Sequence, residues 1–293
     1  MKKVLFRILF VHFLVFVFMG CAKRGTPEGG PIDEEPPEFI RASPENFSIN
    51  FDGDEIEIFF DEYIQLEDAQ RQIIFSPPMD PPPTITPLGT PRKSVKIEIL
   101  DTLQPNTTYA INFGRSVVDN NEGNPLPFFR YIFSTGSYID SLSLSGTVSN
   151  AYSKKTEPFI SVMLYEVDSS YTDSIIYKKP PRYITNTLDS SVTFQLQNLK
   201  AGTYEMIALK DVNSNYTFEP SVDKIGFFED FVQIPNDSTF HLVLFEEELP
   251  FEMAPRPEQV EQQHILFGYQ GEIMEDSIQI ELISNPPANF EQK

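Results

Sequence analysis

Short runs in which apolar and polar residues alternate, separated by turn-forming residues, fill most of the chain between residues 37 and 246. In one such run Ile56, Ile58 and Phe60 occupy every second position, and the run 95–99 has the same pattern. Because successive side chains of a β-strand point to opposite faces of the sheet, this period predicts strands with one buried face. The expected fold class is therefore all-β, with tandem antiparallel β-sandwiches.

The composition agrees with this expectation and restricts the partners. Hydrophobic residues make up 40% of the 293 residues, enough for a core in each of two domains. The chain has 25 Pro and 26 Phe but no Trp, which suits many short strands and turns better than a helical bundle. Its 43 acidic and 22 basic residues give a formal net charge of −21, which argues against nucleic acid as a partner.

Residues 1–20 are predicted to be a signal peptide. Lys2, Lys3 and Arg7 form a basic beginning, and an apolar run follows at 8–19. A membrane-spanning helix needs roughly 20 apolar residues, so this run is too short to be one. The alternative, a buried core helix, fits poorly because the run is apolar on all faces.

The sequence Phe18-Met19-Gly20-Cys21 ends this segment and resembles the lipobox of bacterial lipoproteins. A lipobox needs a small residue before the cysteine and a thiol that takes the diacylglycerol, and Gly20 and Cys21 supply them. Phe18 stands where the family usually has Leu, and Met19 is larger than the usual Ala or Ser. The resemblance implies cleavage between Gly20 and Cys21 and lipidation of Cys21, the only cysteine. The alternative is cleavage elsewhere, which would leave a free thiol.

Residues 21–36 are expected to contain the acylated cysteine and a flexible tether, because they are rich in Pro, Gly and charge. Acyl chains on Cys21 would hold the protein on a membrane, and Lys23 and Arg24 would lie beside the lipid headgroups. The expected location is the cell envelope, with the lipoprotein anchored in the outer membrane. The expected partners are the membrane, through the lipid on Cys21, and an envelope protein or glycan.

A second resemblance covers the first predicted domain, residues 37–137. It is carried by motifs in chain order, namely Pro36-Pro37, Ser43-Pro44, Leu103-Gln104-Pro105-Asn106-Thr107-Thr108-Tyr109, Asp119-Asn120-Asn121-Glu122-Gly123-Asn124 and Phe133-Ser134-Thr135-Gly136. These resemble the bacterial Ig-like domain of the surface-layer-protein type, and the resemblance implies an Ig-like β-sandwich. A Pro-rich insert at 76–87 and the residues Asn121-Glu122 depart from the family pattern.

Turn chemistry accounts for the loop at 119–124 of this domain without any function. Gly123 is expected at positive φ, and Asp119 and the Asn residues beside it are expected to accept hydrogen bonds from backbone N–H groups. A calcium ion in the loop is the alternative.

The parity of each strand also predicts the direction of its side chains. Four residues share the parity of the apolar set of their strand and are expected to face inward: Phe60, Ile97, Tyr109 and Phe133. Three charged residues have the opposite parity and are expected to face water: Glu57, Lys96 and Glu98.

Residues 141–246 are predicted to form a second sandwich. Strands are expected at 160–165, 192–196, 204–209, 231–234 and 240–245. The motif Leu144-Ser145-Gly146-Thr147-Val148, with the later run from Phe194 to Tyr204, resembles the transthyretin-like fold of carboxypeptidase regulatory domains. The resemblance implies an accessory sandwich without catalytic residues, and Gly202 is expected in a tight turn between two strands.

One loop of the second domain has two interpretations. Asp211, Asn213 and Asn215 place oxygen donors at alternate positions, as at the start of a calcium loop, and Asp223 lies nearby. Tyr216, however, stands where such a loop needs Gly for its sharp turn. The alternatives are a solvated turn with Asx caps, which is favoured, and a calcium site made by these four residues.

Residues 247–293 are predicted to be a linker followed by a partial or docked β-hairpin and a polar tail. Strand-like runs occur at 265–269 and 278–283. Two strands do not form a stable domain by themselves. Either they dock onto the second domain, or the chain is a shortened form of a three-domain relative.

No catalytic motif is recognisable. The chain has three His, of which His12 leaves with the signal peptide, and neither His241 nor His264 has a metal-ligand neighbour two or four residues on. There is no nucleophile elbow, phosphate loop or dinucleotide fingerprint. No enzymatic activity is therefore expected, and no cofactor is expected apart from the calcium alternative.

The resulting functional prediction is a lipid-anchored cell-envelope protein whose Ig-like domains have a structural or protein-interaction role. The alternative is a binding module for envelope glycans or an extracellular polymer, and a catalytic role comes last. Sugar sites favour exposed aromatic rings with polar partners. Six residues are candidates for such rings: Tyr63, Phe128, Tyr171, Tyr177, Tyr183 and Tyr216.

Overall fold

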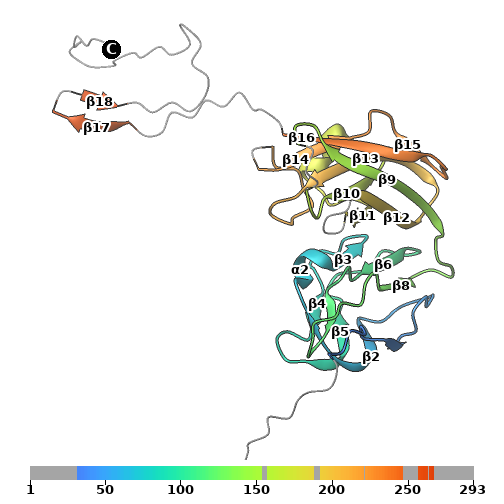
Figure 1. The fold of residues 1–293 in the computed structure, drawn as a ribbon. Coiled ribbons are helices and arrows are strands. Elements are labelled where there is room, and N and C mark those ends of the chain that lie inside the picture. The colour runs from blue at the N-terminus through green and yellow to red at the C-terminus, as the bar shows by residue number, and fades with distance from the viewer. Residues whose placement is uncertain are drawn as a thin grey trace, which may run out of the picture. The chain divides into compact units, whose positions relative to one another are not determined.

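The computed structural model describes residues 32–153, 157–187, 192–220, 222–246, 257–262 and 264–266. The chain divides into two compact units, residues 1–35 and 36–293, and every strand and helix named below belongs to the second unit (Figure 1). The predicted signal peptide, Cys21 and most of the tether lie outside the described residues. Within the described residues no helix has the length and apolar character that a membrane span requires.

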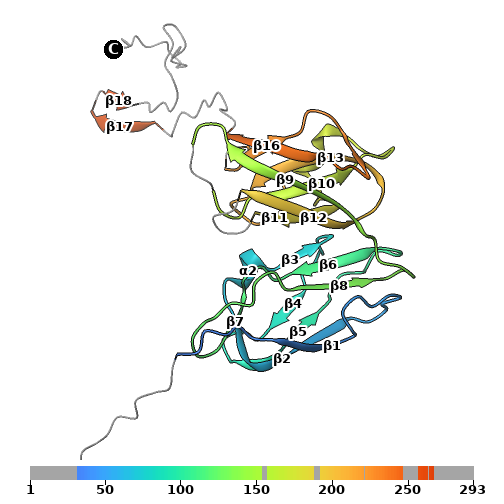
Figure 2. The same cartoon turned by 45° about the vertical axis from the view of Figure 1, so that its right-hand side comes forward.

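Two sheets form the first sandwich, between residues 39 and 134 (Figure 2). One sheet has the order β1 (Phe39–Ser43), β2 (Glu55–Leu66), β5 (Arg92–Glu98) and β4 (Thr84–Thr86), and β7 (Val117–Asp119) pairs with the end of β2. The other has the order β3 (Ile74–Ser76), β6 (Thr108–Asn112) and β8 (Arg130–Ser134). A four-residue helix, α2 (Ala69–Gln72), precedes β3.

The core of the first sandwich lies between these sheets and follows the period predicted from the sequence. The four residues expected to face inward are all buried in it: Phe60, Ile97, Tyr109 and Phe133. The rings of Tyr109 and Phe133 stack with their centroids 5.2 Å apart. The predicted register of these strands is therefore confirmed.

The charged residues of opposite parity lie on the outer face, as expected, but they differ in solvent exposure. Glu98 is exposed, whereas Glu57 and Lys96 are half-buried. The Glu57 carboxylate accepts a hydrogen bond from Ser94 Oγ at 2.7 Å, and Lys96 Nζ lies 2.9 Å from Glu55 Oε2. Cross-strand partners therefore cover part of each side chain.

Strand β2 is longer than the sequence predicts. The charged pair Asp61-Glu62 interrupts the alternation that begins at Ile56, but β2 continues to Leu66. Its register against β5 shifts between Phe59 and Ile64, and beyond the shift it also pairs with β7. The Asp61 carboxylate accepts the Glu38 N–H at 2.8 Å. The charged residues thus mark an irregularity within a strand, which from sequence looks like an end.

The loop after β7 closes around one carboxylate. Backbone N–H groups of Asn121, Glu122, Gly123 and Asn124 donate to the Asp119 carboxylate at 2.7–3.1 Å, and Asp119 is only 3% exposed. Burial alone would raise the pKa of Asp119, but the four donors outweigh it and hold the pKa below its ordinary value. Gly123 has φ of 80°. The turn chemistry predicted for this loop is confirmed.

Eight strands form the second sandwich, between residues 142 and 246. Seven follow the order β11 (Tyr183–Asn186), β10 (Ser161–Glu166), β13 (Gly202–Lys210), β14 (Lys224–Phe227), β16 (Thr239–Glu246), β9 (Leu142–Asn150) and β12 (Thr193–Leu199), and β15 (Val232–Ile234) pairs with β13. A 3₁₀ helix, η1 (Asp173–Tyr177), lies between β10 and β11. Strands β11 and β14 could not be predicted from the sequence, because these four-residue strands show no clean alternation.

The first and last strands of this sandwich, β9 and β16, pair in parallel, whereas the other ladders are antiparallel. The two backbones approach closely at Gly146. A Cβ added there would lie 2.4 Å from the Phe240 carbonyl oxygen and 2.5 Å from the Phe194 ring. Glycine at this position is therefore required by packing rather than by turn geometry.

The turn predicted at Gly202 joins β12 to β13, but these strands do not pair with each other. β12 pairs with β9, and β13 pairs with β10, β14 and β15. The turn therefore takes the chain from one layer of the sandwich to the other instead of closing a hairpin. Tyr204 O–H donates to the Lys200 carbonyl oxygen at 3.2 Å and braces this crossing.

A short hairpin lies beyond the second sandwich. It consists of β17 (Glu258–Glu261) and β18 (His264–Leu266), and all residues described in both strands are exposed. It begins earlier than the predicted run at 265–269, and β17 has no predicted counterpart. The second predicted run, 278–283, lies outside the described residues.

Candidate binding site between the two sandwiches

The two sandwiches meet through the outer faces of β3 and β11. Ile74 of β3 leaves the core of its own sandwich and packs in a cluster with Met163, Ile184 and Ile207 of the second. The Ile184 N–H donates to Ser76 Oγ at 3.1 Å across the same boundary. Adjacent residues of a strand point to opposite faces. Phe75 therefore packs in the core of the first sandwich, whereas Ile74 and Ser76 contact the second sandwich.

A chain of polar contacts borders this apolar contact. Arg130 Nη2 donates to Asn198 Oδ1 at 2.9 Å, and Asn198 Nδ2 donates to the Asp140 carbonyl oxygen at 2.9 Å. The Asp140 carboxylate accepts Thr108 Oγ–H at 2.8 Å. Asp140 lies in the segment between the sandwiches, so both sandwiches bond to it.

A second set of polar contacts joins the loop before β6 to the second sandwich. Arg182 donates to the side chains of Gln104 and Thr107, and Lys200 donates to the Asn106 carbonyl oxygen. The two cations therefore form charge-assisted hydrogen bonds across the boundary between the sandwiches.

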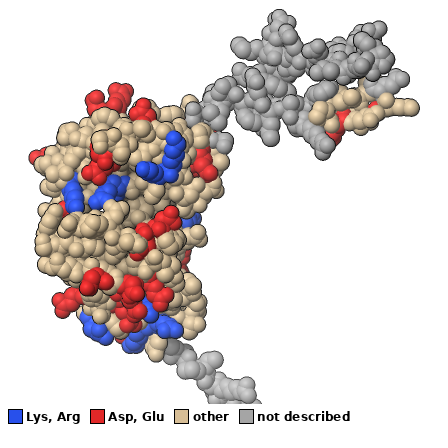
Figure 3. All heavy atoms as spheres, turned by 180° about the vertical axis from the view of Figure 1, so that it is seen from behind, with Lys and Arg blue, Asp and Glu red and all other residues tan. Residues whose placement is uncertain are grey.

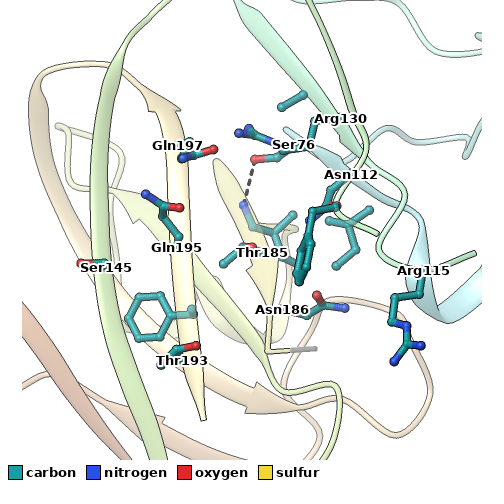
Figure 4. A pocket seen from close by; sticks show the side chains of 15 residues that line it. Ser76, Asn112, Arg115, Arg130, Ser145, Thr185, Asn186, Thr193, Gln195 and Gln197 are labelled. Carbon is teal, nitrogen blue, oxygen red and sulfur yellow. Dashed lines mark hydrogen bonds between the residues drawn. The ribbon is translucent and has the colours of Figure 1, made fainter. Parts of the chain in front are cut away.

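A crevice of about 720 Å³ lies between the sandwiches, beside the Ile74 cluster (Figure 4). Fifteen residues line it. Those from the first sandwich are Ile74, Ser76, Ala110, Asn112, Arg115, Phe128 and Arg130. Those from the second are Ser145, Ile184, Thr185, Asn186, Thr193, Phe194, Gln195 and Gln197. The volume lies within the usual range for small-molecule sites, about 300–1,000 Å³.

Strand parity explains why this crevice is polar. In β12, Phe194 and Leu196 are buried, so Gln195 and Gln197 project from the outer face. In β6, the buried Ile111 leaves Asn112 on the outer face in the same way. The crevice is therefore lined mostly by side chains that would be solvent-facing in an isolated sandwich, although the core residue Phe194 also lines it.

Two lining residues have unusual local states. Asn186 is 7% exposed, and its Oδ1 is buried with no hydrogen-bond partner within the described structure. Phe128 is 66% exposed and has φ of 59°, which is uncommon for a bulky residue. A buried acceptor without a donor and an aromatic ring held in solvent are both features that a bound ligand would stabilise.

A smaller hollow of about 170 Å³ shares Ile74 and Asn186 with the crevice. It adds two cations, Arg71 and Lys210, and the carboxylate of Asp211. The Arg71 guanidinium lies 5.0 Å from the centre of the Phe159 ring. Burial lowers the pKa of Lys210, whose ammonium group donates to the Pro158 carbonyl oxygen. We term the crevice and this hollow together the recess.

The charge of the crevice differs from that of the chain. None of its fifteen lining residues is Asp or Glu, and two are Arg. Acidic residues are 43 of 293, about one in seven, so an average set of fifteen would include about two. Acidic side chains are spread over both sandwiches on the face shown in Figure 3. Burial lowers the pKa of Arg130, which nevertheless stays a cation at neutral pH.

The residues of the calcium alternative lie in one loop, where their oxygens already bind protein donors. Asp211 accepts the N–H groups of Asn215 and Tyr216, at 3.2 and 2.8 Å. The loop brings the other acidic residue of the set close as well. Asp223 accepts the N–H groups of Val212 and Glu219, at 3.0 and 2.9 Å.

The two Asn residues of that set are used similarly. Asn213 Nδ2 donates to the Glu219 carboxylate, and Asn215 Oδ1 accepts both the N–H and the hydroxyl of Thr217 at 2.9 Å. Asx-turn bonding of this kind is what the favoured alternative predicts. Among the described residues no group of three or more His, Cys, Asp or Glu is placed to hold a metal ion. The calcium site remains a prediction.

The six aromatic candidates for a sugar site are dispersed. Only Phe128 lines the crevice, and Tyr216 lines the adjoining hollow. Tyr183 is buried in the second core, and Tyr171 O–H donates to Glu205 at 2.6 Å. Tyr63 and Tyr177 are exposed elsewhere. The amides and arginines of the crevice were not predicted as site residues, because on an alternating strand they have the pattern of ordinary outer-face residues.

The two remaining histidines occupy surface positions. His241 is exposed on β16, and its ring nitrogens lie 2.8 Å from Thr147 Oγ1 and 3.1 Å from Ser149 Oγ. His264 is exposed on β18 beside Glu261. Neither arrangement resembles a catalytic base aimed at a cleft.

Comparison with known proteins agrees with the fold of the first sandwich. Residues 33–135 match the sequence model of the bacterial Ig-like domain family. A solved structure of BcpA, the major pilin subunit of Bacillus cereus, is 12% identical, covering 71% of this chain and 69% of the pilin, with a TM-score of 0.20. At that TM-score the likeness supports no conclusion. No curated protein matches the sequence.

Proposed function

We propose that this protein is a lipid-anchored component of the cell envelope with a structural or interaction role. The observation that carries the role is the bacterial Ig-like domain at residues 33–135, a non-catalytic kind of module that fits a surface or extracellular protein. The lipobox-like segment ending at Cys21 supports the lipid anchor and, with it, the outer membrane as the location. The partner is then the membrane on one side and an envelope protein or polymer on the other.

Replacing the lipid-accepting thiol tests the anchor. In cells that express the full chain, Cys21→Ser should abolish labelling by radioactive palmitate and release the protein from the membrane fraction or block its processing. Ala22→Ser, which leaves the thiol in place, is the matched control and should keep both. Full labelling and membrane partition of Cys21→Ser would contradict the lipoprotein assignment.

A second candidate function is the binding of an envelope glycan or extracellular polymer in the crevice. The observation that favours it is the combination of the exposed Phe128 ring with the carboxamides of Asn112, Gln195 and Gln197. Carboxamides both donate and accept hydrogen bonds, as sugar hydroxyls do, and an aromatic face covers the apolar side of a sugar ring. Titration of the chain from residue 22 onward with oligosaccharides tests this function.

A further inference from the structure

The charge of the crevice narrows the class of polymer that it would bind. Its lining contains Arg115 and Arg130 but no carboxylate, in a chain with a formal net charge of −21. The Arg115 side chain is exposed, and within the described residues no partner for its guanidinium is observed. Arg130 is half-buried and uses one nitrogen on Asn198. A local excess of positive charge in an acidic protein concentrates anions at that place.

The adjoining hollow extends this positive character. Arg71 and Lys210 line it, and its single carboxylate, Asp211, has both oxygens engaged by backbone N–H groups. Burial raises the pKa of Asp211, while the backbone N–H groups that it accepts lower it. Arg115 and Arg130 therefore line the crevice, and Arg71 and Lys210 line the hollow that shares Ile74 and Asn186 with it. Arg71 also lies 3.8 Å from the Asp68 carboxylate.

The uncharged polar side chains of the crevice indicate which other groups the ligand carries. Figure 4 shows the Asn112, Asn186, Gln195 and Gln197 side chains around the same space, from both sandwiches. Asn186 Oδ1 is buried without a donor among the described residues, and an unsatisfied buried acceptor is destabilising. A ligand hydroxyl would satisfy it, whereas a carboxylate, which is only an acceptor, would not.

We propose that the recess between the two sandwiches binds a segment of an acidic polysaccharide. The arginines face the carboxylates of the polymer, the amides bind its hydroxyl groups, and Phe128 covers one sugar ring. This assignment rests on the second candidate function and adds the charge of the ligand. An acidic peptide offers carboxylates but few hydroxyl groups, so it satisfies only the arginines.

Calorimetric titration of the chain from residue 22 onward tests the assignment. The probes are an oligogalacturonate, a neutral cello-oligosaccharide of equal length, and a poly-glutamate of equal charge. We expect the oligogalacturonate to bind at least about tenfold more tightly than either of the others. Binding should weaken when salt rises from about 0.05 to about 0.5 M, because the charge contacts are partly exposed.

Matched variants locate the site. Arg115→Ala and Phe128→Ala should each weaken oligogalacturonate binding about tenfold. Arg92→Ala and Phe47→Ala should not, although Arg92 is also exposed and Phe47 has 60% exposure and φ of 65°, much like Phe128. These are surface positions, and a thermal melt of each variant confirms that it folds.

An isosteric change tests the charge separately. Gln195→Glu places a carboxylate in the crevice and should weaken oligogalacturonate binding about tenfold. Gln233→Glu makes the same change at an exposed residue of β15, outside the crevice, and should leave binding unchanged.

Each contrary result overturns the proposal. Absence of binding, equal losses in crevice and control variants, or equal binding of poly-glutamate would do so. Tight binding of the neutral oligosaccharide that is lost in Phe128→Ala would overturn the charge assignment and keep the second candidate function. The palmitate labelling of Cys21 tests the envelope anchor independently of all these outcomes.

Discussion

Neighbouring residues of β5 experience opposite environments. Ile97 is fully buried between the two sheets of the first sandwich. Lys96 projects from the other face, where its ammonium group lies 2.9 Å from Glu55 and 3.3 Å from Glu98. Its side chain is 39% exposed. Exposed ion pairs of this kind contribute little, whereas a buried aliphatic side chain contributes both hydrophobic transfer and packing.

We therefore expect Ile97→Ala to lower the free energy of unfolding by about 2–5 kcal/mol. Lys96→Ala should cause only a small fraction of that loss. Chemical denaturation of the chain from residue 22 onward measures both. Equal effects at the two positions would mean that β5 does not have one buried face.

A buried carboxylate can organise a loop as firmly as an apolar side chain. Asp119 accepts four backbone N–H groups, so Asp119→Ala leaves these donors without their acceptor and should destabilise the protein by about 1–3 kcal/mol or more. Glu122→Ala changes an exposed side chain of the same loop and should be close to neutral. Denaturation curves of the two variants compare them directly, and a harmless Asp119→Ala would contradict the role given to the carboxylate.

The pH dependence of stability follows from the same group. Because the folded state holds the pKa of Asp119 below its ordinary value, the carboxylate stabilises the fold at pH values above the unfolded pKa, about 4. That stabilisation is lost as the pH falls through the lower, folded pKa. Asp119→Asn should therefore reduce the stability difference between neutral pH and about pH 3. If the variant lost as much stability at low pH as the unmodified protein, other carboxylates would determine the pH dependence.

At the scale of elements, the parallel pair β9–β16 is a close contact between two strands of the second sandwich. It joins the two ends of this sandwich along six residue pairs, from Ser145 with Thr239 to Asn150 with Leu244. A side chain at Gly146 would collide with the backbone of one neighbouring strand and the ring of another. The pairing of β9 with β16 therefore depends on a residue without a Cβ atom.

We expect Gly146→Ala to destabilise the second sandwich by about 1–3 kcal/mol, the usual penalty for overpacking. Ser145→Ala, one residue earlier on the exposed face, is the control and should be nearly neutral. Thermal denaturation of both variants provides the comparison. If Gly146→Ala were as stable as the unmodified protein, β9 and β16 could move apart without loss of stability.

At the scale of the whole unit from 36 to 293, the two sandwiches share buried surface. Ile73 and Ile74 are adjacent and equally buried, at 5% exposure each. Ile73 belongs to the core of the first sandwich, whereas Ile74 belongs to a cluster made otherwise of second-sandwich residues. Ile73, which follows α2, thus stabilises its own domain, and Ile74, the first residue of β3, stabilises the contact between domains.

Amide hydrogen exchange distinguishes these two roles. Ile74→Ser should increase exchange in β10 and β11 of the second sandwich as well as in β3, because the shared cluster loses its central contribution from the first sandwich. Ile73→Ser should increase exchange in the first sandwich and leave β10 and β11 unchanged. Unchanged protection of β10 and β11 in Ile74→Ser would mean that the two sandwiches do not stabilise each other.

Local patterns determined which strands have one buried face and how some turns close. The inward direction of Ile97 and Tyr109 follows from a period of two residues, and the closure around Asp119 follows from a carboxylate placed just before consecutive backbone donors. Both depend on residues close in sequence, so they could be predicted before the fold was known. The continuation of β2 beyond Asp61 could not, because its later partner, β7, lies far along the chain.

Only the tertiary structure decided the parallel pairing of β9 with β16 and the position of the crevice. Gln195, Asn112 and Arg130 lie on strands separated in sequence, and each has the alternation of an ordinary solvent-facing residue. They line one recess because Ile74 and Ile184 bring two outer sheet faces into contact. Alternation specifies which face of a strand a side chain occupies, but the packing of another domain determines whether that face meets water or a recess.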